Sequence, residues 1–141
     1  MQSEVFMIRT TALLVMAALL CVACGSDSIT GPTPTSFAGT WNGTVADSLC
    51  GNGIFQGVLA QSGSSVTGTG SVVFTRAGCG GIRGSLNGTV SGASLQATLQ
   101  SSDPQYCSLA LSVAVSGSTI TGTYAAANCS YTQTGNVSAT R

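Results

Sequence analysis

From residue 37 onwards, apolar and polar residues alternate in short runs that are separated by turn residues. Alternation with a period of two is typical of a β-strand that buries one face and exposes the other. The breaks are rich in glycine and serine and recur about every ten residues, which indicates many short antiparallel strands. The expected strands cover 39–47, 53–61, 65–75, 81–90, 93–101, 106–115, 118–126 and 132–141.

The two faces of these predicted strands differ sharply in chemistry. One face runs from Trp41 and Val45 to Val137 and is almost wholly apolar, whereas the other consists mostly of threonine, serine, asparagine and glutamine. A register shift of one residue would expose the apolar side chains to water, so the register of strand pairing is well defined. We therefore predict an all-β domain over 37–141, an eight-stranded antiparallel up-and-down barrel, with an eight-stranded β-sandwich as the alternative.

The connections between the predicted strands are of two kinds, short Ser-Gly turns and longer segments. In an up-and-down order, alternate connections lie at the same end of the sheet, so the short turns share one end and the longer connections share the other. Each longer connection holds or borders one cysteine: Cys50, Cys79, Cys107 and Cys129. Four cysteines at one end of the domain predict two disulfides.

A zinc site is the alternative reading of these cysteines, but the chain has no histidine and no short Cys-x-x-Cys spacing. Three pairings of four cysteines exist. We favour Cys50–Cys79 with Cys107–Cys129, and the next choice is Cys50–Cys129 with Cys79–Cys107.

The segment before the domain carries an export signal. Residues 8–22 are nearly all apolar, too short for a transmembrane helix and typical of the central region of a signal peptide. Val22-Ala23-Cys24-Gly25 resembles the bacterial lipobox, with Cys21 in the place where that family usually has leucine. The resemblance implies that residues 1–23 are removed and that Cys24 is lipidated.

Residues 24–36 form a polar tether that contains Pro32 and Pro34. The lipobox resemblance implies that Cys24 carries three acyl chains. Three chains are enough for stable anchoring, so we expect the membrane itself to be a partner. Gly25 stands where retention signals of the inner membrane typically have aspartate, and the resemblance to bacterial lipoproteins therefore implies the outer membrane of the cell envelope. An ordinary secreted protein is the alternative.

Charged residues are too few to support several classes of function. After residue 23 the chain keeps three arginines and three aspartates, and the only glutamate is Glu4. No basic patch for nucleic acid is present. Without histidine or lysine there is almost no candidate for acid–base or nucleophilic catalysis, so we expect a protein that is not an enzyme and needs no cofactor or metal.

Two short motifs resemble those of known small barrels. Gly39-Thr40-Trp41 is similar to the Gly-x-Trp motif of lipocalins and avidins, and residues 118–124 resemble a strand of avidin-like barrels. In lipocalins an arginine near the end of the last strand packs over that tryptophan. The resemblance implies that Arg141 packs over Trp41 at the closed end of the barrel. It does not extend to the biotin contacts of avidin.

An eight-stranded barrel is either filled by its own side chains or just wide enough for one small ligand. Glycines at inward positions would leave room for a guest or would let the strands bend as the barrel closes. Aromatic residues and arginines gather towards the cysteine end, where they would form the mouth of a ligand site or belong to ordinary core and surface. The candidate ligand-binding residues are Phe55, Phe74, Tyr106, Tyr124, Tyr131, Arg76 and Arg83.

Three functions are compatible with these features. The first is a membrane-anchored binding barrel that holds a small, largely apolar ligand at its mouth. The second is a protein-interaction module, for instance an inhibitor of a periplasmic hydrolase, and the third is a structural component of the envelope. Because the tether enters beside Trp41, we expect the cysteine end to point away from the membrane.

Overall fold

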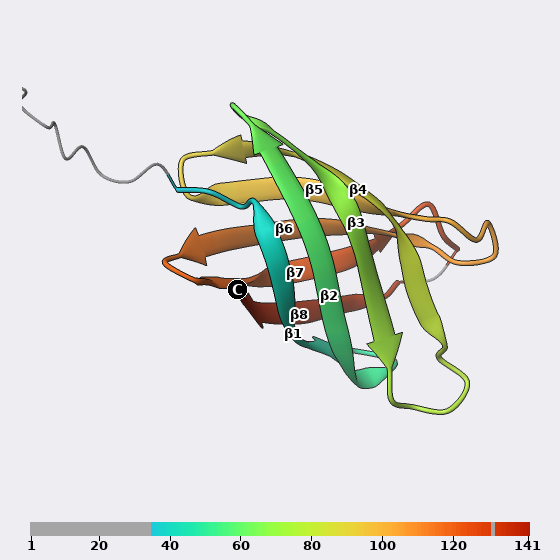
Figure 1. Cartoon of the computed structure of the whole chain (residues 1–141). Coiled ribbons are helices and arrows are strands. Elements are labelled where there is room, and N and C mark those ends of the chain that lie inside the picture. Colours follow the sequence, from blue (N-terminus) through green and yellow to red (C-terminus); the bar gives the residue numbers. More distant parts are fainter. Residues whose placement is uncertain (1–34, 131) are drawn as a thin grey trace, which may run out of the picture. The chain divides into compact units, whose positions relative to one another are not determined.

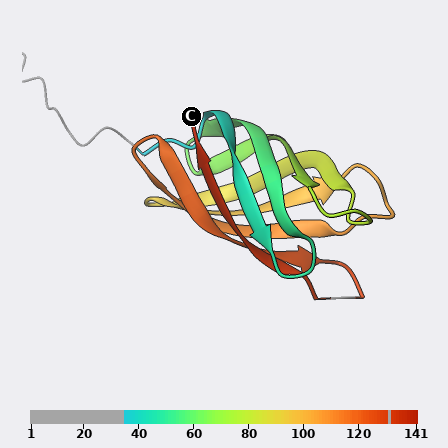
Figure 2. The same ribbon diagram turned by 90° about the horizontal axis from the view of Figure 1, so that it is seen from below.

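Eight antiparallel strands form a closed barrel, in which each strand pairs with the next and the last pairs with the first. The computed structural model describes residues 35–130 and 132–141. The strands are β1 (Gly39–Asp47), β2 (Gly51–Ser62), β3 (Ser65–Phe74), β4 (Gly81–Ser91), β5 (Ser94–Ser101), β6 (Ser108–Ser116), β7 (Thr119–Ala127) and β8 (Thr134–Thr140). Figure 1 shows their order, and Figure 2 shows β8 beside β1. The predicted up-and-down barrel is confirmed, because a single sheet closes on itself where a sandwich would have two.

The strand boundaries differ from those expected by only a few residues. The largest shifts are at the starts of three strands: β2 begins at Gly51, β6 at Ser108 and β8 at Thr134. Tyr106 belongs to the preceding loop, because its backbone N–H donates a 3.1 Å hydrogen bond to the carbonyl of Asp103 within a turn. Turn geometry at that position replaces the sheet ladder that alternation alone would predict.

The connections fall at two ends, as their lengths predict. The turns β2–β3, β4–β5 and β6–β7 lie at one end, which we call the turn end; the other four connections lie at the opposite end, the disulfide end (Figure 1). Gly63, Gly92 and Gly117 each have a positive φ, of 57°, 59° and 59°. Glycine adopts this conformation without steric cost, so each tight turn contains the residue that it requires.

Large apolar side chains fill the interior of the barrel. The residues with the largest fully buried side chains are Trp41, Phe37, Phe55, Leu86, Leu99, Leu109, Val66 and Val72. They belong to one hydrophobic cluster, to which all eight strands contribute. A packed cluster of this kind is the filled form of an eight-stranded barrel.

Inward-facing glycines are covered by neighbouring side chains. A Cβ placed on Gly57 would lie 3.1 Å from Cζ of Phe55, and one placed on Gly70 would lie 3.2 Å from Cδ1 of Leu99. Both distances are within tight van der Waals contact, so the space left by each missing side chain is already occupied. These glycines bring the wall and the core together and leave no room for a guest at either point.

The turn end is closed by Trp41 and Arg141. The guanidinium carbon of Arg141 lies 4.9 Å from the centroid of the Trp41 ring, a cation–π contact. Arg141 Nη1 also donates hydrogen bonds of 2.9 and 2.7 Å to the carbonyls of Ser36 and Ala38. The indole Nε1–H of Trp41, which is fully buried, donates a 2.8 Å hydrogen bond to the carbonyl of Phe37. The pair implied by the lipocalin resemblance is thus in contact.

Candidate functional site

Two disulfides tie the connections of the disulfide end together. Cys50 is bonded to Cys79 and Cys107 to Cys129, with Cα–Cα distances of 5.7 and 5.6 Å. The first bridge links the β1–β2 and β3–β4 connections, and the second links β5–β6 and β7–β8. This is the pairing that the sequence favours. Each bridge removes conformational freedom from the unfolded chain and holds two loops at a fixed separation.

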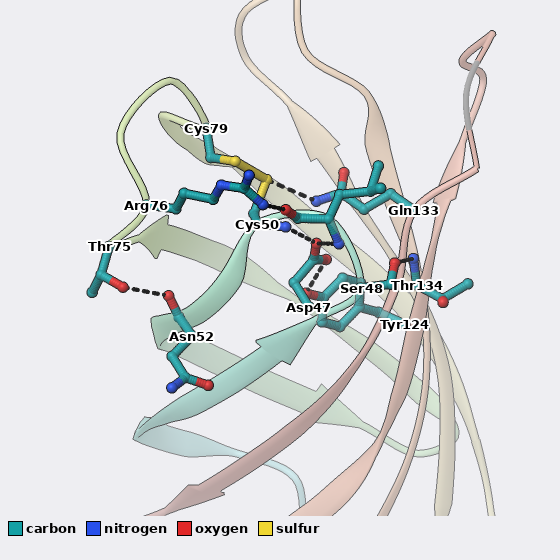
Figure 3. Close-up of a disulfide and its surroundings, with 11 residues drawn as sticks. Asp47, Ser48, Cys50, Asn52, Thr75, Arg76, Cys79, Tyr124, Gln133 and Thr134 are labelled. Atoms are coloured by element: carbon teal, nitrogen blue, oxygen red, sulfur yellow. Dashed lines mark hydrogen bonds between the residues drawn. A yellow bond between two sulfur atoms is a disulfide. The ribbon is translucent and has the colours of Figure 1, made fainter.

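Asp47, the last residue of β1, organises the centre of this end (Figure 3). Its Oδ1 accepts hydrogen bonds of 2.8 and 2.7 Å from the backbone N–H groups of Leu49 and Cys50. Its Oδ2 accepts a 2.6 Å hydrogen bond from the hydroxyl of Tyr124. One carboxylate therefore fixes the β1–β2 connection and ties it to β7.

These contacts change the acidity of both partners. Partial burial alone would raise the pKa of Asp47, but hydrogen bonds from Tyr124 and from the N–H groups of Cys50 and Leu49 outweigh it and lower the pKa below the ordinary 3.8. Burial, followed by the hydrogen bond to Asp47 and the negative charge of Asp47, raises the pKa of Tyr124. At neutral pH the pair is a carboxylate that accepts from a neutral phenol.

A second set of contacts braces the β7–β8 connection against the β1–β2 connection (Figure 3). The N–H of Ser48 donates a 2.8 Å hydrogen bond to the carbonyl of Thr134, and the N–H of Thr134 donates one of 3.1 Å to Oγ of Ser48. Gln133 is only 4 % exposed, and its amide nitrogen contacts Sγ of Cys50 at 3.7 Å. The disulfide Cys50–Cys79 therefore lies within a network of polar contacts.

The β3–β4 connection is fixed in the same way (Figure 3). Arg76 Nη1 donates a 2.6 Å hydrogen bond to the carbonyl of Leu49. Thr75 donates from both its backbone N–H and its hydroxyl to the carbonyl of Asn52, at 3.0 and 2.9 Å. The loops of the disulfide end thus form a mutually braced surface, which is a suitable platform for binding because little freedom is left to lose.

Three of the candidate ligand-binding residues belong to the core. Phe55, Phe74 and Tyr124 are 2 %, 8 % and 3 % exposed and lie in the hydrophobic cluster. The ring of Tyr124 occupies the space where Gly135 has no side chain. These aromatic residues fill the barrel and do not line an open mouth. Their burial weighs against a small ligand held among them.

The other candidate residues lie on the surface, but not in one place. Tyr106 is 41 % exposed on the β5–β6 connection, where its hydroxyl lies close to Gly80. Arg76 is exposed on the β3–β4 connection, and Arg83 is exposed on the outer wall, where it lines a groove over β2–β5. Tyr131 lies outside the described residues.

Four of the five exposed large apolar side chains of the described residues lie near the disulfide end. They are Leu49, Ile54, Val73 and Tyr106, which are between 41 % and 54 % exposed, whereas the fifth, Val58, lies towards the turn end of β2. Leu49 and Tyr106 are on the braced connections, and Ile54 pairs in register with Val73 next to them. Elsewhere the outer wall is mainly threonine, serine and amide side chains, so this concentration marks one region of the surface.

Metal-binding and membrane-spanning features were sought in the described part of the chain. Over 35–130 and 132–141, no group of three or more His, Cys, Asp or Glu side chains could hold a metal ion. No helix in these ranges has the length and apolar character needed to cross a membrane. The predicted signal peptide 1–23, the predicted lipidation site Cys24 and the expected tether up to residue 34 lie outside the described residues.

Comparison of the chain with protein-family models, with curated proteins and with solved structures finds no match. The closed eight-stranded antiparallel barrel itself fits the calycin type of small barrel, the group that contains lipocalins and avidins.

Sequence reasoning did not single out Asp47 and Gln133, which hold the disulfide end together. The signal was present, because Asp47 follows Trp41, Gly43 and Val45 in the inward alternation, and Gln133 likewise precedes Gly135. A polar residue in the inward phase at the end of a strand needs a buried hydrogen-bond partner. That rule would have identified both residues as structural anchors.

Proposed function

We propose that this chain is a non-catalytic, membrane-anchored binding protein that captures a protein partner at the disulfide end of its barrel. The observation that carries the proposal is the contrast between a filled interior and a braced end that exposes Leu49, Arg76 and Tyr106. Aromatic residues and arginine are enriched among the residues that contribute most to protein–protein affinity.

Rigidity supports a protein partner over a small apolar ligand. A ligand at the mouth needs a cavity, and Phe55, Phe74 and Tyr124 are packed into the core instead. A protein partner needs only a surface whose loops are already ordered, which lowers the entropic cost of binding. An exported hydrolase remains our example of such a partner.

Anchoring through Cys24, in the outer membrane of a bacterial envelope, completes the proposal and rests on the lipobox resemblance. The two disulfides agree with an oxidising compartment outside the cytoplasm. With the chain entering the barrel at Phe37, beside Trp41 on the turn end, the disulfide end is the one that a partner would meet.

Site-specific photo-crosslinking in a bacterial envelope tests the proposal. A benzophenone amino acid replaces Leu49 or Tyr106 in the full chain, and the matched control replaces Ala93, which is exposed in the β4–β5 turn at the opposite end. We expect one discrete adduct from positions 49 and 106 and none from 93, and we expect Tyr106→Ala to weaken binding of the captured partner at least about ten-fold. Equal labelling from all three positions, or no adduct from a folded chain, contradicts a specific partner and favours the structural envelope role.

A further inference from the structure

A groove crosses the outer wall of the barrel over β2, β3, β4 and β5. Its volume is about 760 Å³, within the range of ligand-binding clefts. Neighbouring strands are spaced about 4.8 Å apart, so the groove extends over roughly 14 Å from β2 to β5. It is therefore long enough for an oligomer.

The floor of the groove is a register row of glycines. Gly57 pairs with Gly70, and Gly70 pairs with Gly84. Their hydrogens point inwards, and the side chains of Phe55 and Leu99 reach the wall from the core beneath Gly57 and Gly70. Without side chains in this row, the backbone of the wall lies closer to the core than it does elsewhere, which leaves a depression on the outer surface.

Polar side chains of the flanking rows form the sides. One side is a register row of amide, hydroxyl and guanidinium groups, from Gln56, Ser71 and Arg83. The other is a register row of hydroxyl and amide groups, from Thr69, Ser85 and Gln100. Among the described residues that line the groove, Val58 has the one large apolar side chain. Both sides offer groups that donate and accept hydrogen bonds.

Arg83 gives the groove its charge. Within the described part of the chain, its guanidinium has no hydrogen bond or salt bridge, and no acidic side chain lines the groove. The other two arginines of the described residues are engaged, Arg76 with the carbonyl of Leu49 and Arg141 with Trp41 and backbone carbonyls. An exposed guanidinium among neutral polar groups is complementary to a single carboxylate.

The groove is unsuited to an extended peptide that binds by strand addition. Each of β2, β3, β4 and β5 has a strand on both sides, so no backbone edge is free there. A ligand must be recognised by side chains alone. Hydroxyl and amide groups in two parallel rows match the hydroxyl groups of a sugar chain.

We propose that this groove binds an acidic glycan, a sugar oligomer whose carboxylate is held by Arg83 and whose hydroxyls are met by the two polar rows. The site is separate from the protein-binding surface of the disulfide end and does not depend on it.

Titration calorimetry of the full chain in mild detergent and low salt tests the proposal, with trigalacturonic acid as the probe and maltotriose as its neutral counterpart. We expect binding of trigalacturonic acid alone, a loss of at least about ten-fold in R83Q, and a smaller loss in R83K, which keeps the charge but not the paired donors. The control is Thr121→Asp, which changes the net charge equally on the outer face of β7. It should retain the wild-type affinity.

A second variant separates binding from charge alone. Ser85→Trp fills the groove from an exposed position and should abolish binding while circular dichroism shows an unchanged barrel. The proposal is overturned if trigalacturonic acid does not bind, if R83Q or the filled groove binds it as tightly as the wild type, or if maltotriose or pentaglutamate binds equally well. Crosslinking at residues 49 and 106 reads a different surface, so either proposal can fail without the other.

Discussion

The hydroxyl of Tyr124 reaches Asp47 across β8, in a 2.6 Å hydrogen bond between residues that are 77 positions apart in the sequence. Gly135 of β8 pairs in register with both residues and lies beneath the tyrosine ring. A side chain on β8 at this point would block the contact. The missing side chain therefore lets two non-adjacent strands interact directly. Because Asp47 also accepts hydrogen bonds from the β1–β2 connection, this contact links that connection to a tyrosine of the core.

Removing the tyrosine hydroxyl should destabilise the barrel. In Tyr124→Phe the ring still fills the core, but Asp47 loses a hydrogen bond to its charged form, which costs about 1–3 kcal/mol. Urea unfolding at neutral pH measures the loss. Tyr106→Phe is the matched control and should change the free energy of unfolding by less than about 0.5 kcal/mol, because its side chain is exposed. Equal losses in the two variants would contradict the role of the Tyr124 contact.

The lowered pKa of Asp47 predicts a specific dependence of stability on pH. A carboxyl whose pKa is lower in the folded than in the unfolded protein stabilises the fold above its unfolded pKa of 3.8 and loses that contribution as the pH falls through the folded value. The difference in unfolding free energy between the wild type and Asp47→Asn should therefore be constant from pH 7 to pH 5 and shrink below pH 3.8. Unfolding curves at pH 7, 5, 3 and 2 measure it. A difference that grows in acid would refute the sign of the shift.

Arg141 should stabilise the turn end through its shape as well as its charge. Arg141→Lys keeps a cation near Trp41 but loses the planar group that donates to two carbonyls, so we expect a loss of about 1–2 kcal/mol. Trp41 is the only tryptophan, and its fluorescence reports directly on this contact. Arg83→Lys is the control, and it should leave both stability and the emission spectrum unchanged. A wild-type emission spectrum and stability in Arg141→Lys would show that the planar shape of the guanidinium is unimportant.

Two neighbouring glycines of one register row should differ in their tolerance of alanine. At Gly84 an added Cβ would collide with the backbone carbonyl of Gln100, whereas at Gly70 it would lie 3.2 Å from the end of the Leu99 side chain. Backbone in a closed ladder cannot move away, but a leucine methyl can. Gly84→Ala should cost more than about 3 kcal/mol, and Gly70→Ala should stay within about 1 kcal/mol of the wild type. Thermal unfolding followed by circular dichroism compares them, and a reversed order would contradict this account.

Alternation, turn spacing and the order of the connections were sufficient to predict the barrel, the turn end and the disulfide end. These features depend on local periodicity and on parity, both of which can be read from one sequence. The contact of Arg141 with Trp41 was available only through the resemblance to lipocalins. Local periodicity does not show which side chain the residue at the end of the last strand will contact.

Alternation could place Phe55 and Tyr124 on the inward face, but it could not show what they meet there. Phe55 covers Gly57 of its own strand, and alternation does not show that its ring leans along the strand. For Tyr124 the contact depends on register, because the glycine that its ring covers, Gly135, lies on the neighbouring strand. The outer groove was missed for the same reason. Gly57, Gly70 and Gly84 are far apart in the sequence and form a row only after three strands have paired.

Pairing of β1 with β8 also has a consequence for biosynthesis. Until β8 has left the ribosome, β1 has no second neighbour and the ring of strands stays open, whatever β2 to β7 have already formed. Contacts of such high sequence separation form slowly, because closing the long loop between them costs entropy before the contacts can stabilise the chain. The closed barrel can therefore form only after nearly the whole domain has been synthesised, so its last step follows synthesis.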